Sequence, residues 1–118
     1  MPDHVLDPDS IAALNSVAPD DGGAFLRELL DIFLADTPNR LAEISRSLEA
    51  GDFPTLTRAA HSIKGSAGNF GARALVEAAW RLEMAARSKN RALAQDLVAP
   101  LEQEFGKVRS AMEALRGP

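Results

Sequence analysis

Apolar residues recur at intervals of three and four along most of the chain, which is the spacing of one face of an α-helix. The pattern predicts a short helix that Asp7 caps and Pro8 begins, and a long helix over residues 24–50. Pro38 interrupts the long pattern although the apolar spacing continues past it, so we expect one kinked helix or two helices nearly in line. Three more helices are predicted over residues 53–70, 72–89 and 93–115, the last again kinked at Pro100.

The lengths of these helices and of their connections predict how they pack. Four long amphipathic helices joined by short turns favour an all-α fold, an antiparallel up-down-up-down four-helix bundle. The short additional N-terminal helix is expected to cover one end. The 21 Ala residues, the absence of Tyr and the 5% aromatic content suit helices better than strands. With 118 residues, the chain is expected to form a single domain over residues 1–118, with residues 1–6 as a flexible tail.

Composition and charge exclude several classes of function. Because Cys is absent, disulfides, Cys-ligated metal sites and thiol catalysis are excluded. The net charge of −4 argues against non-specific binding to nucleic acid, and the apolar runs are shorter than a membrane span. The N-terminus shows no export signal, so we expect a cytoplasmic protein without a membrane partner. Because the predicted core uses most of the large apolar residues, we expect a monomer.

His61 is the strongest candidate for a residue that takes part in chemistry. A helical wheel places it opposite the apolar stripe of its helix, so its side chain should project into solvent. Gly65 and Gly68 follow on the same outward face, although each costs about 0.5–1 kcal/mol in a helix interior relative to Ala. Such glycines leave room beside the imidazole for a bulky group or another protein. Lys64 and Arg58 lie one turn to either side and can reach an anion on the ring.

The residues around His61 favour some reactions of an exposed imidazole and disfavour others. Residues 53–75 carry three basic and no acidic side chains in an otherwise acidic chain, which favours a specific anionic group. Metal binding is disfavoured because no other ligand type stands three or four residues from His61. General-base catalysis needs an orienting carboxylate, which we do not expect on the outer surface of a bundle. A neutral imidazole can, however, accept a phosphoryl group on its free nitrogen.

A motif around His61 matches a known family. Residues 61–72 read HSIKGSAGNFGA, which resembles the H-x-[L/I]-K-G-[S/A]-x-x-x-[L/F]-G-A signature of histidine-containing phosphotransfer (HPt) domains. Residues 48–52 and the pair Leu82-Glu83 resemble flanking features of the same family. The resemblance implies that His61 is the phosphoacceptor, that Lys64 supports the phosphoryl charge and that Gly65 gives access to the ring.

Other residues of the motif are less specific. Gly68 and Asn69 fall where the family keeps small or polar residues near the site, but a helix-surface or capping role suits Asn69 equally well. Gly71 is expected to end the helix rather than to touch phosphate. Trp80 departs from the family pattern, and it either covers the flank of the bundle or belongs to a partner contact.

The resemblance implies a phosphorelay intermediate rather than an autonomous enzyme. The sequence has no Gly-rich nucleotide loop, so we expect no kinase site for ATP. By the resemblance, the partners are receiver domains of response regulators or hybrid sensor kinases, and the receiver brings the Mg²⁺ that phosphoryl transfer needs. Two alternatives stay open: a helical docking bundle that is not phosphorylated, and a phosphoacceptor domain excised from a larger hybrid or chemotaxis-type kinase. The Met1 start favours a standalone protein.

Overall fold

Five α-helices make up most of residues 4–117, the part of the chain that the computed structural model describes. No strand occurs within these residues, so the predicted all-α fold is confirmed. The helices are α1 (Pro8–Asn15), α2 (Ala24–Ala50), α3 (Phe53–Gly68), α4 (Arg73–Arg87) and α5 (Arg91–Arg116).

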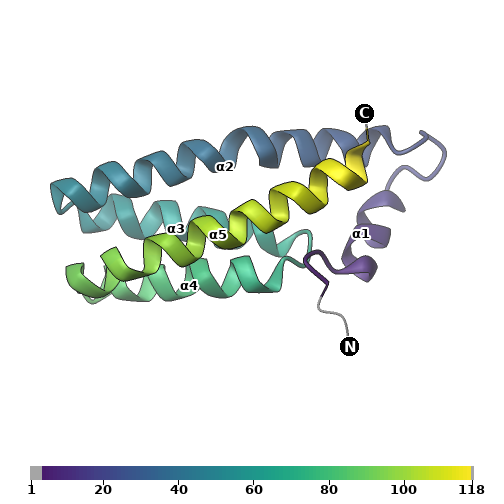
Figure 1. Cartoon of the computed structure of the whole chain (residues 1–118). Helices are drawn as coiled ribbons and strands as arrows, with labels where there is room; N and C mark the ends of the chain where they lie inside the picture. Colours follow the sequence, from purple (N-terminus) through teal and green to yellow (C-terminus); the bar gives the residue numbers. More distant parts are fainter. Residues whose placement is uncertain (1–3, 118) are drawn as a thin grey trace.

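The four long helices pack side by side around one core. Figure 1 shows α2 to α5 running in alternate directions, with α1 at the right-hand end of the bundle. Each long helix contacts the next in the chain, and α5 returns to contact α2, which closes the bundle. The core is built from the inward stripes of all four, as the spacing predicts. None of the helices in residues 4–117 is long and apolar enough to cross a membrane.

Capping residues mark the junction between α2 and α3. Gly51 ends α2 in the left-handed conformation, with φ of 70°, which glycine adopts without steric cost. Asp52 then accepts a hydrogen bond from the backbone N–H of Thr55 and so starts α3. Pro38 and Pro100 both lie within continuous helices, so residues 24–50 form one helix rather than two.

The turn between α3 and α4 differs from the prediction. α3 ends at Gly68, so Phe70 lies in the turn, where it is still buried and packs against Phe33 with 5.4 Å between ring centroids. Gly71 has φ of 64°, and a Cβ there would stand 2.3 Å from Cβ of Asp7. The backbone N–H of Asp7 donates to the carbonyl of Phe70. The turn is therefore shaped to receive the segment before α1.

Two further differences concern the chain ends. The tail predicted for residues 1–6 includes residues 1–3, which lie outside the described residues, whereas Leu6 packs against the core. Leu93 and Leu115, at the two ends of the apolar spacing that predicts the last helix, are both exposed and lie outside the core. Ala94 is buried instead, because it lies seven residues before Leu101 and so continues that residue's stripe.

Candidate functional site

His61 stands in the middle of α3 with its side chain directed to solvent. Its side chain is 60% exposed, while the opposite face of the helix is buried. The helical wheel therefore predicted the orientation of the imidazole correctly. The buried face consists of Leu56, Ala59, Ala60, Ile63 and Ala67.

A buried carboxylate from the neighbouring helix contacts the imidazole. Glu83 of α4 has a side chain only 2% exposed, and its Oε2 lies 3.1 Å from Nδ1 of His61. Its Oε1 lies 2.7 Å from Nζ of Lys64. Nη2 and Nε of Arg87 donate to Oε2 at 2.8 and 3.2 Å. One carboxylate thus joins three side chains that carry or can carry positive charge.

These contacts determine the charge of Glu83. Burial by itself raises the pKa of the carboxyl, but the contacts from Lys64, Arg87 and His61 outweigh burial and lower that pKa from 4.5 to about 2. Glu83 is therefore ionised at neutral pH, although it is buried.

An ionised Glu83 fixes the role of each imidazole nitrogen. A carboxylate can only accept hydrogen bonds, so Nδ1 of His61 must carry the proton in this contact. In the neutral ring, Nε2 then holds the free electron pair. Because the side chain is mostly exposed, we assign Nε2 as the nitrogen available to an external electrophile.

The expectation that the surface offers no orienting carboxylate is wrong. The sequence did carry a signal, because Glu83 follows Leu82 at the edge of the stripe formed by Leu75, Ala79 and Ala86. A charged residue in a buried stripe needs a partner. Which helix would supply that partner was not visible from the pattern.

Of the other predicted site residues, some lie close to His61 in the structure and one does not. Lys64 is partly buried and contacts Glu83, while Arg58 is exposed and lines the same groove as His61. Gly65 and Gly68 are exposed, and a Cβ on either would have no other side chain or distant backbone within 4 Å. Asn69 is the C-cap of α3, about 12 Å along the helix from His61, so it does not join the cluster.

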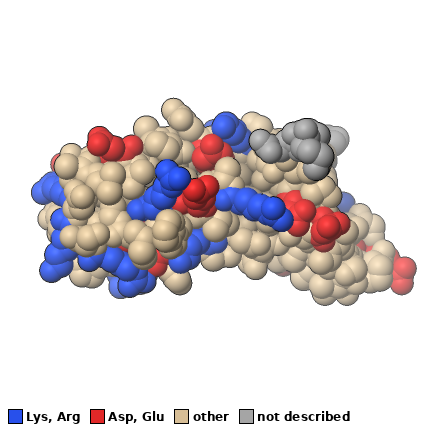
Figure 2. All heavy atoms as spheres, turned by 90° about the horizontal axis from the view of Figure 1, so that it is seen from below, with Lys and Arg blue, Asp and Glu red and all other residues tan. Residues whose placement is uncertain are grey.

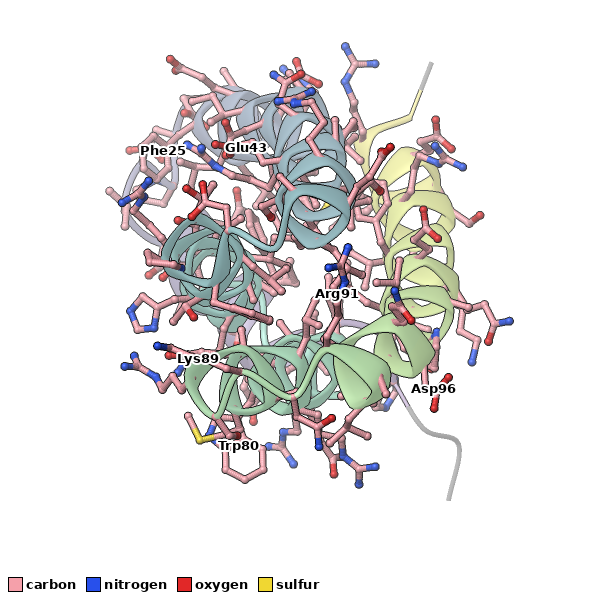
Figure 3. All side chains as sticks on the ribbon, turned by 90° about the vertical axis from the view of Figure 1, so that its left-hand side faces the viewer. Phe25, Glu43, Trp80, Lys89, Arg91 and Asp96 are labelled. Atoms are coloured by element: carbon pink, nitrogen blue, oxygen red, sulfur yellow. The ribbon has the colours of Figure 1, made fainter. Side chains whose placement is uncertain are left out.

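A shallow groove beside His61 contains cations that the sequence analysis did not assign. Arg87, the last residue of α4, and Lys89, in the turn after it, line this groove together with Arg58 and His61. Figure 2 shows Lys and Arg side chains gathered toward the left-hand end of the bundle, where α4 ends. In Figure 3, Lys89 lies at the end of α4, on the side of the bundle formed by α3. The remaining lining residues are Phe53, Pro54, Thr57 and Ala86.

Comparison with known proteins assigns the family. The model of the Hpt domain family matches residues 28–117. The chain belongs to the Hpt domain family. Accordingly, this Hpt domain is a phosphorelay intermediate of two-component signal transduction, as the sequence predicts.

Solved structures support this assignment. Histidine-containing phosphotransfer protein B from Pseudomonas aeruginosa PAO1 is 35% identical over 95% of this chain and 94% of its own, with a TM-score of 0.86. A rice protein described as a histidine-containing phosphotransfer protein shares the fold at 21% identity, with a TM-score of 0.83 over 95% of this chain and 79% of its own. A maize phosphotransfer protein shares it at 23% identity, with a TM-score of 0.79 over 90% and 78%. No curated protein matches this Hpt domain in the sequence comparison.

Trp80 lies outside the His61 cluster. It is 48% exposed on α4 and lines a separate hollow with Gly68, Gly71 and Arg73. Figure 3 shows its ring on the outer side of α4. Both interpretations of Trp80, flank cover and partner contact, stay predictions.

Proposed function

We propose that His61 accepts the phosphoryl group on Nε2 from the phospho-Asp of a receiver domain and passes it to a second receiver. The observation that supports this most is the contact between Nδ1 of His61 and the ionised Glu83, which leaves Nε2 unprotonated and facing solvent. The electron pair of Nε2 attacks phosphorus, the bond from phosphorus to the partner's carboxylate oxygen breaks, and that carboxylate leaves with the bonding pair.

Glu83 assists this transfer without reacting. When Nε2 bonds to phosphorus, Nδ1 keeps its proton and the ring gains a positive charge. The buried carboxylate at 3.1 Å stabilises that charge where it develops. In the onward transfer, the N–P bond breaks and the ring becomes neutral again. Glu83 is therefore a positioning residue whose contact with the ring serves both directions of transfer.

Lys64 supplies the compensating charge on the phosphoryl side. It lies one helical turn from His61 and contacts Glu83 before phosphorylation. The arriving phosphoryl oxygens compete with Glu83 for the Lys64 ammonium group. Glu83 keeps Arg87 as a counter-ion when Lys64 turns toward the phosphoryl group. Gly65 leaves the space beside the ring open for this group and for the partner.

This Hpt domain acts as a carrier without a kinase site of its own. The partners are receiver domains of response regulators or hybrid sensor kinases, and the domain meets them as a monomer. Within residues 4–117, His, Asp and Glu side chains do not form a cluster of three that could hold a metal ion. As the family resemblance implies, the Mg²⁺ that assists the transfer is expected on the receiver.

The decisive test replaces His61 by Gln and compares it with His4→Gln, a change at the other, exposed histidine. Each variant is incubated with a phosphorylated receiver and, separately, with phosphoramidate, and acid-labile, base-stable phosphate is measured. We expect His61→Gln to lose all uptake and keep its helical circular dichroism, because the side chain faces water. His4→Gln should match the wild type. Uptake by His61→Gln would show that another residue is the acceptor, and no uptake by the wild type would favour a purely docking bundle.

A further inference from the structure

The backbone of Lys89 has a conformation that side chains disfavour. Its φ is 57°, the one positive value at a non-glycine residue within residues 4–117. Lys89 follows the last turn of α4, where its N–H donates to the carbonyl of Ala86 and the next N–H donates to that of Ala85. Helices usually place glycine at this point, as α2 does with Gly51. Since a side chain there costs roughly 1 kcal/mol, ending the helix does not explain the lysine.

The position of Lys89 in the groove beside His61 indicates a functional role for its positive charge. Lys89 lines the groove that also contains His61, together with Arg58 from α3 and Arg87 from α4. Among the described residues that line this groove, three are cations and none is a carboxylate. Arg58 lies one turn before His61, whereas Lys64 lies one turn after it. The groove therefore lies on the side of the imidazole opposite to Lys64, the residue that is assigned to the phosphoryl group.

We infer that this groove receives an acidic surface segment of the partner receiver, next to its phosphorylated Asp, and that Lys89 and Arg58 determine how fast the partner docks. The inference rests on the proposed function, since the groove is continuous with the phosphoacceptor. Arg58 lies on α3 and Lys89 lies in the turn after α4, so their positive charge covers an area wider than a single phosphoryl group. Complementary charge at the rim of an interface mainly raises the association rate.

The test uses Lys89→Gly, which removes the positive charge and the steric cost of a side chain at a positive φ. The probe is a receiver domain from the source organism that transfers to the wild type, loaded with acetyl phosphate in the presence of Mg²⁺. We expect kcat/KM with this probe to fall about threefold, and about tenfold for Lys89→Gly combined with Arg58→Gln. The melting temperature of Lys89→Gly should rise by about 3 °C. Phosphorylation of His61 by phosphoramidate should be unchanged in the single variant Lys89→Gly, because that donor needs no docking surface.

Two controls make the result specific. Lys89→Arg keeps the charge and should keep the transfer rate, and Lys107→Gln removes an exposed cation from α5 and should have no effect. Unchanged kcat/KM for Lys89→Gly, or an equal loss with receiver and phosphoramidate, would overturn the docking inference alone. A lower melting temperature would overturn the claim that glycine suits this turn better. If the wild type took phosphate from neither donor, the proposed function and this inference would fail together.

Discussion

Replacing Glu83 by Gln removes a buried negative charge from the contact between α3 and α4 while keeping the shape of the side chain. The fall of the Glu83 pKa from 4.5 to about 2 corresponds to about 3 kcal/mol of native-state stability. This is an upper bound, because His61 and Arg87 are more than half exposed and water can solvate them when the carboxylate is gone. We therefore expect a loss of about 1–3 kcal/mol at pH 7.

The pH dependence of this loss identifies its cause. A carboxyl whose pKa is lower in the folded protein stabilises it above pH 4.5, and this contribution disappears as the pH falls through about 2. Since Gln resembles the protonated carboxyl, the difference in unfolding free energy between wild type and Glu83→Gln should be largest at pH 7 and shrink toward zero at pH 2.

Urea unfolding, followed by circular dichroism at several pH values and constant ionic strength, measures this difference. The matched control is Glu77→Gln, which removes an exposed carboxylate from the same helix and should change stability little at any pH. Glu83→Gln should also slow phosphotransfer roughly tenfold, because an amide can donate or accept and no longer fixes which ring nitrogen is protonated. A stability difference that stays constant from pH 7 to pH 2 would refute the claim that Glu83 is ionised in its buried position.

Three further substitutions test separate features. Lys64→Ala should slow transfer from a phosphorylated receiver roughly tenfold, the equivalent of about 1–2 kcal/mol, and high salt should partly mimic it; an unchanged time course would remove Lys64 from the site. Gly65→Gln should raise stability by up to about 1 kcal/mol yet reduce transfer, so a variant that transfers at the wild-type rate contradicts the access role. Gly71→Ala should lower the unfolding free energy by about 1–3 kcal/mol, because its φ is positive and a Cβ would collide with Asp7; equal urea midpoints would contradict that packing.

Sequence periodicity predicted correctly those features of the fold and the site that depend on one helix alone. The bounds of α2 and the outward direction of His61 follow from spacing, from Gly51 and from a rotation of about 100° per residue. The contact between His61 and Glu83 depends on how α4 is rotated and positioned against α3, which no local pattern specifies. The end of α3 was misplaced because the buried Phe70 continues the helical spacing, although the chain has already left the helix there.

The exposed position of His61 on α3 has a kinetic consequence for the proposed transfer. Under the proposed function, a donor receiver and an acceptor receiver must both reach Nε2 of His61 from the solvent side of α3, so only one can react with it at a time. The donor has to leave before the acceptor arrives, and the residence time of each complex therefore limits the flux of phosphoryl groups. Tight binding would slow such a relay. A receiver that docks but lacks its phosphorylatable Asp should act as a competitive inhibitor of signalling.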